Sequence, residues 1–416
     1  MMNFFKKLHH KRQLAKFFDY AAHTPMRDEV IQVMEDEIRE YGNPSSIHGY
    51  GVAAQKKIED ARTRIANIFK VSSSEIIFTP GGTASINLAI QGVLGAFSQQ
   101  FPDRTPHIIT SNVEHSAVRQ TVRNLTELGV ITSTELPVNE FGIVAAADVI
   151  SAVTEDTVLV TMMMVNNEYG AVFPIQEIGK ALFVYKKETS VQYPLFHVDA
   201  SQAFLPFEII PRSLHIDVLS CSSAKTYGPA HGGVLYARKG IKLSEIMYGG
   251  SQEQKLWPGT QSVADIVAAV ASFELAARER EQEVMRVSEL QSYVREQLQS
   301  SLAQEFGLQF SLPLENVSPY ILHGYIEGVS SERLLLELDA YGYSISAQAA
   351  CDSDKEGISE AVKALWSAQG NSSYEGDRAV FRISFGLYSN KKGIDGFIQA
   401  LNNILKKFQQ EQGLLK

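Results

Sequence analysis

The feature that most constrains this chain's fold is an alternation of strand-like and helix-like patterns between residues 75 and 240. Short apolar runs, many of them rich in β-branched residues, predict strands at 75–79, 107–110, 157–165, 193–199, 216–220 and 233–238. Helical periodicity lies among them at 84–97, 115–128 and 175–188. Alternation of this kind is typical of an α/β layer with a mostly parallel sheet, in which ligands bind at the carboxyl ends of the strands.

The rest of the chain predicts a smaller α+β domain. A long helical pattern covers 263–303, and strand-like or helical patterns follow at 319–328, 331–341, 344–351, 379–386 and 394–408. A chain of 416 residues exceeds the size at which one hydrophobic core keeps growing, so two domains are expected. We place a large ligand-binding domain at 16–262, and a small domain at 263–416 together with 1–15.

Composition argues against several partners. A formal net charge of −9 argues against a nucleic-acid backbone. No apolar run reaches the roughly 18 residues of a membrane span, and the basic N-terminal stretch lacks the apolar core of a secretory signal. The two cysteines, Cys221 and Cys351, are too few for a disulfide framework and suit a reducing compartment. We therefore expect a cytoplasmic protein that binds no nucleic acid, membrane or metal.

Polar residues follow the first three predicted strands. Gly82 and Thr83 open a helix after the first strand, where free backbone N–H groups and the helix dipole favour an anion. An ordinary glycine turn with Thr83 as the helix cap fits the same residues. His115 follows the second strand and also fits a helix cap or a surface position. Asn167 lies in the polar stretch after the third strand.

The fourth and fifth strand ends add a carboxylate and a lysine. Asp199 ends a buried strand, with Gln202 three residues further on, and a buried acid needs a partner. Lys225 lies in a turn of small residues, where a solvated lysine would be the ordinary interpretation. Pyridoxal 5'-phosphate (PLP) requires a lysine, an acid and an anion site, and a flat group helps by stacking on its ring. Together, the five strand ends predict a PLP site.

Eight segments spread over nearly the whole chain carry a resemblance to a known family. They are FDYAAHTP (18–25), GNPSSIHGYG (42–51), HIITSNVEHSAV (107–118), VNNEYGAV (165–172), HVDASQ (197–202), KTYGP (225–229), GGSQEQKLWPGT (249–260) and FRISFG (381–386). In these segments the chain resembles the cysteine desulfurases (NifS/IscS-like) of the class V aminotransferase superfamily. The resemblance implies a homodimeric fold-type I PLP enzyme, with helices on both faces of a mostly parallel large-domain sheet and a small α+β domain.

The resemblance also implies roles for single residues in cofactor binding. Lys225 would be the Schiff-base lysine, Asp199 would pair with the pyridine nitrogen, and Gln202 would bond the phenolic oxygen. His115 would stack on the ring and take part in catalysis. The implied phosphate-binding residues are Gly82, Thr83, Ser222 and, from the other subunit, Thr260.

Further positions would handle the substrate. Asn167 and Arg382 would bind it, with the planar guanidinium of Arg382 as a fork for a carboxylate. Cys351 matches the family's catalytic cysteine, whereas Cys221, on a strand, fits a small buried hydrophobe. The implied reaction turns L-cysteine into L-alanine and leaves the sulfur as a persulfide on Cys351. An acceptor protein, either an iron–sulfur scaffold or a tRNA-thiolation relay, would then take that sulfur.

At a few positions the chain departs from the family pattern. Ala224 stands where a phosphate-binding histidine is usual, Ala84 where glutamate is usual, and Trp257 where arginine is usual. These changes do not replace any of the implied catalytic residues, but they can alter the affinity for the cofactor and the range of substrates. Two other functions stay open at this point: another PLP reaction, such as selenocysteine or cysteine lysis, and a non-catalytic role as a sulfur-transfer partner.

Overall fold

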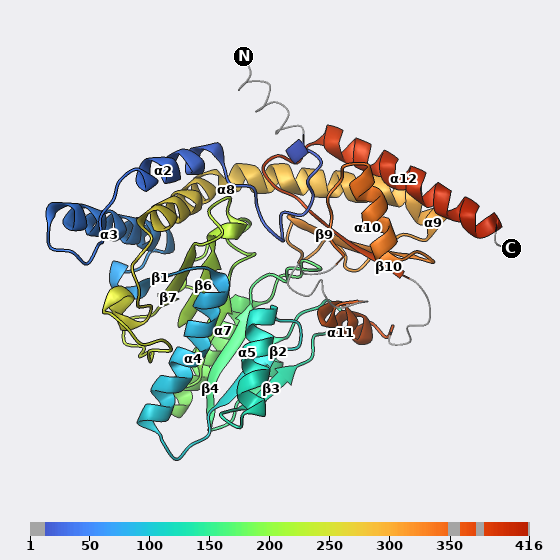
Figure 1. Cartoon of the computed structure of the whole chain (residues 1–416). Helices are drawn as coiled ribbons and strands as arrows, with labels where there is room; N and C mark the ends of the chain where they lie inside the picture. The colour runs from blue at the N-terminus through green and yellow to red at the C-terminus, as the bar shows by residue number, and fades with distance from the viewer. Residues whose placement is uncertain (1–12, 348–357, 372–377, 415–416) are drawn as a thin grey trace. The chain divides into compact units, whose positions relative to one another are not determined.

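The computed structural model describes residues 13–347, 358–371 and 378–414 (Figure 1). Within these ranges the chain divides into two compact units. We call Thr24–Asn166 with Phe173–Arg280 the sheet unit. The terminal unit comprises the described parts of Met1–His23, Asn167–Val172 and Glu281–Lys416.

The sheet unit is built on a seven-stranded sheet with the strand order β1-β7-β6-β5-β4-β2-β3. The strands are β1 (Ile76–Thr79), β2 (His107–Ser111), β3 (Thr132–Leu136), β4 (Thr157–Met163), β5 (Leu195–Asp199), β6 (Val218–Ser222) and β7 (Gly233–Ala237). Neighbouring strands are parallel from β6 through β5, β4 and β2 to β3, while β7 is antiparallel to both of its neighbours. The predicted α/β class with a mostly parallel sheet is confirmed.

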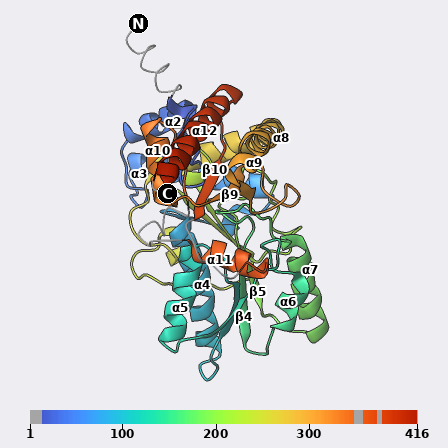
Figure 2. The ribbon, with the colours of Figure 1, turned by 90° about the vertical axis from the view of Figure 1, so that its right-hand side faces the viewer.

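Helices cover both faces of this sheet. Figure 2 shows α4 (Gly82–Gln100) and α5 (Ser116–Glu127) on one side, with α6 (Ala146–Ser151) and α7 (Ile175–Thr189) on the other. All seven residues of β4 are buried, as expected for a strand covered on both faces. The edge strand β3 reads TSTEL and is only partly buried, and the sequence analysis missed it because polar residues form no apolar run.

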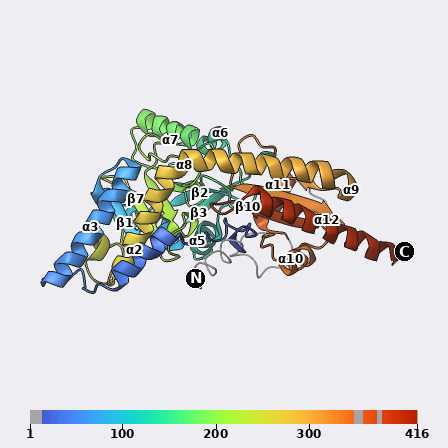
Figure 3. The same cartoon turned by 90° about the horizontal axis from the view of Figure 1, so that it is seen from above.

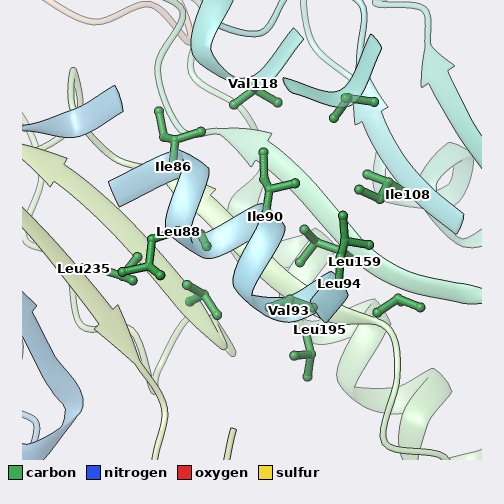
Figure 4. Close-up of a cluster of buried hydrophobic side chains, with 14 of the residues drawn as sticks. Ile86, Leu88, Ile90, Val93, Leu94, Ile108, Val118, Leu159, Leu195 and Leu235 are labelled. Carbon is green, nitrogen blue, oxygen red and sulfur yellow. The ribbon is translucent and has the colours of Figure 1, made fainter. Parts of the chain in front are cut away.

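Helix α4 lies at the centre of the hydrophobic core. Its apolar residues lie on all sides of the helix, a pattern typical of a helix buried in a core. Leu88 and Ile90 are fully buried and belong to the same cluster as Leu159 and Leu235 of the sheet (Figure 4). Burying one such side chain contributes about 1.5–3 kcal/mol, so packing fixes where the N-terminus of α4 lies.

Two helices near the start of the sheet unit, α2 (Asp28–Ile38) and α3 (Gly49–Phe69), have no counterpart in the sequence prediction. The buried face of α3 includes Ala54, Ala61 and Ala66. Ile58, Ile65 and Phe69 lie on the same buried face at helical spacing, so a hydrophobic signal was present and the sequence analysis missed it. None of the helices in the described ranges is long and apolar enough to cross a membrane.

The terminal unit contains the small α+β fold that the sequence predicts. Its antiparallel sheet has the order β10-β9-β8, with β8 (Gln309–Phe310), β9 (Ile321–Glu327) and β10 (Arg378–Ser384). Its helices include α9 (Gln304–Phe306), α10 (Ser331–Ala340), α11 (Glu360–Ala368) and α12 (Lys391–Leu414). The second half of α8 (Val263–Leu298) lies beside α12 (Figure 3), where the Tyr293 hydroxyl donates to Asp395 at 2.6 Å.

Candidate active site

Lys225 lies in a short 3-10 turn, Ser223–Lys225, directly after β6. The turn leads back into β7, so the lysine stands at the strand end that the sequence predicted. The Ser223 hydroxyl fixes the turn, because it donates to the carbonyl oxygens of Pro229 (2.5 Å) and Gly232 (3.0 Å). Lys225 is half-buried, and most residues of the turn around it are buried. The interpretation of Lys225 as a solvated lysine in an ordinary turn is therefore wrong.

Asp199 is the last residue of β5 and is only 6% exposed. Its Oδ1 accepts two hydrogen bonds from Ser201, one from the backbone N–H (2.9 Å) and one from the hydroxyl (2.7 Å). These bonds orient the carboxylate, so Oδ2 is the oxygen suited to meet a ligand. The sequence analysis did not single out Ser201, although a carboxylate that bonds the backbone two residues on is the pattern of an Asx turn.

The N-terminus of α4 lies against the ends of β5 and β6. A Cβ atom added to Gly82 would lie 3.2 Å from Cβ of Ser222 and 3.4 Å from Oγ of Ser201. The helix cap is Gly81, which has no side chain to satisfy the first N–H groups of the helix. The alternative with Thr83 as the cap is therefore wrong. The N–H groups at the start of α4 and the Ser222 hydroxyl form a cradle suited to a phosphate, with Ser201 beside it and bonded to Asp199.

His115 caps α5. Its Nδ1 accepts a hydrogen bond from the N–H of Ala117 at 3.1 Å, so the helix-cap interpretation of this histidine is confirmed. An accepting Nδ1 places the proton of a neutral ring on Nε2. The half-buried imidazole is thus held by a local bond, with an N–H donor at its other nitrogen.

Glu114 is a buried carboxyl that the sequence analysis missed. Its Oε1 accepts from the Ser111 hydroxyl (2.6 Å) and from the N–H of Met163 (3.0 Å), while Oε2 has no hydrogen-bond partner in the part of the chain described. Burial, with a smaller contribution from the negative charge of Asp199, raises the pKa of Glu114 to about 8. Its position beside His115, at a strand end, was the available signal.

The other predicted cofactor residues also lie in the sheet unit. Thr83 is the second residue of α4, Gln202 is half-buried after β5, and Ser222 ends β6. Thr260 is exposed, beyond a short 3-10 turn at Gln252–Lys255. The structure thus brings Gly82 and Ser222 together directly, and links Asp199 to them through Ser201.

Arg382 and Asn167 lie in the terminal unit. Arg382, on β10, is 1% exposed, and its Nη1 donates to the backbone oxygen of Asn167 at 2.8 Å. Its Nη2 donates to Oδ1 of Asp19 at 2.7 Å, an ion pair that the sequence analysis missed. Nε has no acceptor among the described residues. Burial, with a smaller contribution from the guanidinium charge, lowers the pKa of His323 to about 3, so this imidazole, the cross-strand neighbour of Arg382, stays neutral.

The structure describes one of the two cysteines. Cys221 lies on β6 and is 1% exposed, and burial raises the pKa of its thiol well above the ordinary value. The interpretation of Cys221 as a small buried hydrophobe is confirmed. Cys351 lies outside the described residues, so its role stays a prediction.

Comparison with known proteins identifies the family. Residues 16–397 match the family described as aminotransferase class-V. The chain belongs to this family. The cysteine desulfurase IscS of Dictyoglomus turgidum is 36% identical over 394 residues, covering 94% of this chain and 95% of that protein.

Solved structures share the fold as well. A structure described as a NifS-like protein superposes with a TM-score of 0.83 at 30% identity, covering 94% of this chain and 99% of that one. A structure of SspA in complex with cysteine has a TM-score of 0.73 at 28% identity, covering 90% and 100% of the two chains. The predicted resemblance to NifS- and IscS-like proteins of the class V superfamily is confirmed.

Membership of the class V family implies the use of PLP, and the sheet unit fits that cofactor. The cradle at Gly82 leaves room that a Cβ atom would begin to fill, and it is lined by the Ser222 hydroxyl and helix N–H groups. Asp199 is a buried carboxylate at a strand end, and Lys225 lies three residues beyond Ser222. An anion site, an acid and a lysine are thus supplied by consecutive parts of one sheet edge.

Proposed function

We propose that this chain is a PLP-dependent cysteine desulfurase, which converts L-cysteine to L-alanine and transfers the sulfur to its own Cys351. The observation that carries the proposal is the cradle of Gly82 and Ser222, with Ser201 and Asp199 beside it, at the sheet edge that also carries Lys225. The names of the class V relatives support the reaction. When bound, PLP supplies an electron sink that stabilises negative charge at the substrate Cα.

The residues of the sheet unit would hold the cofactor and move one proton. Lys225 would bind the cofactor aldehyde and then, once released, take the proton from the substrate Cα. Asp199, oriented by Ser201, would keep a proton on the pyridine nitrogen. Gln202 would bond the phenolic oxygen, and His115 would stack on the ring, its orientation set by the bond to Ala117.

The phosphate would lie at the N-terminus of α4. There Gly82 and Thr83 offer backbone N–H groups and Ser222 offers a hydroxyl, so no net positive side-chain charge is required. Thr260 would complete the site from a second subunit. Ala224, in place of the usual histidine, is expected to weaken phosphate binding.

The substrate would bind through its carboxylate to Arg382, with Asn167 beside it. Arg382 is buried and charged, and its Nε–H has no acceptor among the described residues, which supports an anionic ligand there. The SspA structure in complex with cysteine supports cysteine as that ligand. L-cysteine is therefore the proposed substrate.

The sulfur transfer would use Cys351. Its thiolate would attack the substrate sulfur, and the carbon–sulfur bond would break with its electron pair left on carbon. That carbon takes up a proton and alanine leaves, while the persulfide stays on Cys351. A sulfur-acceptor protein, belonging to an iron–sulfur scaffold or a tRNA-thiolation relay, would collect it.

We also propose a homodimer in the cytoplasm. The sheet unit exposes large apolar side chains within or beside segments that carry the resemblance, namely Tyr41 (74% exposed), Ile47 (98%), Tyr50 (61%) and Tyr248 (86%). A second copy of this chain would cover them and bring its Thr260 to the cradle. The domains at 16–262 and at 263–416 with 1–15 would carry the cofactor and the Cys351 loop. The small number of cysteines supports a reducing compartment.

Persulfide trapping after a pulse of cysteine tests the proposal. We expect a mass increase of one sulfur on the peptide that holds Cys351, with alanine released. Cys351→Ala should bind PLP normally but form no persulfide and release no alanine. Lys225→Ala should lose the visible absorbance of bound cofactor. Cys221→Ala is the matched control, and it should keep the absorbance, the persulfide and the release of alanine. Sulfide or pyruvate released at the wild-type rate from Cys351→Ala would indicate a lyase. A colourless, inactive wild type would indicate a non-catalytic partner.

A further inference from the structure

Thr24 holds the turn that carries Lys225 from outside that turn. It lies 200 positions before Ala224 and is 1% exposed. Its backbone N–H and its hydroxyl both donate to the carbonyl oxygen of Ala224, each at 3.0 Å. The same hydroxyl accepts from the N–H of Tyr227 at 2.7 Å. One buried hydroxyl is thus bonded to the backbone on both sides of Lys225.

These bonds determine the geometry of the lysine's own backbone. The carbonyl of Ala224 belongs to the peptide group that enters Lys225, so holding this oxygen twice fixes the plane of that peptide. Because a peptide group is planar, its orientation restricts the direction in which the Lys225 side chain leaves the backbone. The alanine side chain at position 224 cannot make a hydrogen bond that would do the same.

The turn also contains a conformation that needs support. Tyr227 has φ = 63°, in the left-handed region that bulky residues seldom adopt. Such a conformation persists only where surrounding contacts determine it. Here the N–H of Tyr227 donates to Thr24, and the N–H of Arg27 donates to the carbonyl oxygen of Tyr227 at 3.2 Å.

The segment that supplies these bonds is itself anchored. The Arg27 guanidinium forms an ion pair with Glu279 of α8 at 2.6 Å, and both side chains are largely shielded from solvent. A chain of contacts therefore runs from α8 through Arg27 and Thr24 to the lysine turn. All of these residues belong to the sheet unit.

We propose that Thr24 is a positioning residue, whose hydroxyl holds the backbone of Lys225 so that its amine meets the cofactor aldehyde. The inference rests on the proposed role of Lys225. It assigns a function to a residue that touches neither the cofactor cradle nor the Asp199 carboxylate in the contacts described above. Its effect should be on the rate of covalent attachment rather than on the phosphate site.

Trapping with borohydride measures that rate directly. Wild-type chain and variants are mixed with PLP, quenched with borohydride at set times, and the fraction of Lys225 carrying the reduced cofactor is read by mass spectrometry. Thr24→Val keeps the shape of the side chain and removes both hydroxyl bonds. We expect its labelling rate at saturating PLP to fall at least tenfold. Thr24→Ser restores the hydroxyl and should return the rate to within about threefold of wild type.

Thr110 provides the matched control. It is a buried threonine of the same unit, 0% exposed, and its hydroxyl has no partner in the part of the chain described. Thr110→Val should therefore label Lys225 at the wild-type rate. Thermal unfolding without cofactor shows whether each variant is folded. If Thr24→Val is not folded, Thr24→Ala, which also removes the hydroxyl, takes its place in the test.

Four outcomes decide the matter. Slow labelling in Thr24→Val with rescue by Thr24→Ser supports the proposal. Labelling of Thr24→Val at the wild-type rate overturns the proposal, because the hydroxyl would then be irrelevant to attachment. Labelling of a folded Thr24→Ser at least tenfold more slowly than wild type also overturns it, because the hydroxyl would then be insufficient. If Lys225 of the wild type is never labelled, the proposed function fails and this inference fails with it.

Discussion

Each of the two units carries some of the predicted site residues, and the two units hold these residues in different ways. In the sheet unit, Asp199 and His115 bond to groups two residues further along the chain. In the terminal unit, Arg382 bonds to Asn167 and Asp19, which are 215 and 363 positions away. The difference has a physical cause. A strand end or helix start offers local N–H donors to an acceptor, whereas a buried guanidinium needs acceptors that only distant segments provide.

Glu114 departs from this local pattern in the sheet unit, because it bonds to the N–H of Met163, 49 positions away, and its other oxygen has no partner among the described residues. The Ser111 hydroxyl, the Met163 N–H and the charge of Arg119 favour the carboxylate, while burial and Asp199 oppose it and raise the pKa to about 8. The unfolded chain releases this proton near pH 4.5. Between about pH 5 and 8 the unfolded state therefore binds fewer protons, and the free energy of unfolding falls as pH rises.

The largest expected effect follows from that pKa. Glu114→Gln keeps an oxygen for Ser111 and Met163 and removes the titration. Relative to wild type, the variant should gain stability as pH rises from 5 to 8, on the order of 4 kcal/mol by pH 8, and the gain should level off above about pH 9. Urea unfolding across this range measures the difference. Glu127→Gln, at the exposed end of α5, is the control, and an equal slope in both variants would refute the assignment.

Breaking the ion pair of the terminal unit should have the next largest effect. Asp19→Ala leaves the Arg382 charge buried without its carboxylate, which should lower the free energy of unfolding by about 3 kcal/mol. Urea unfolding of the variant measures this loss. The exposed pair Lys70–Glu208 is the contrast, and Glu208→Ala should cost less than about 1 kcal/mol. Similar losses in the two variants would mean that burial does not distinguish these pairs.

A smaller effect concerns the lysine turn. Ala224→His should add a donor beside the proposed phosphate site and tighten PLP binding about tenfold, or ~1.4 kcal/mol. Fluorescence titration with PLP measures the change. Unchanged or weaker binding would mean that another group already supplies this contact, or that the turn does not accept the larger side chain.

The smallest effect concerns the segment before Thr260, where Glu253, Gln254 and Lys255 all have positive φ. Glu253 is held by a buried ion pair to Arg62 at 2.7 Å, so a tertiary contact maintains the local strain. Lys255→Gly should raise the unfolding free energy by about 1 kcal/mol, because glycine adopts φ = 70° without a steric penalty. Thermal unfolding measures it. Lys239→Gly, where φ is ordinary, should destabilise instead.

Much of the sheet unit could be predicted from the sequence, because its signals are local. The runs that form β4 and β5 are apolar and bounded by turns, and strand order places their ends on one edge. Two features were missed because their local signals are weak: the polar edge strand β3, and Ser201, whose importance lies in its bond to Asp199. Helix α3 was missed although its buried face is apolar.

The sequence by itself determined which elements form and which polar residues follow the strands, since hydrophobic periodicity and turn residues act over a few positions. Only the tertiary structure decided what each polar group bonds to. Asp19 reaches Arg382, and Thr24 reaches the turn of Lys225, across 363 and 200 positions of chain. The pKa of Glu114 likewise depends on its complete burial by the packed core. Partners and burial arise from packing between distant segments, which no local pattern encodes.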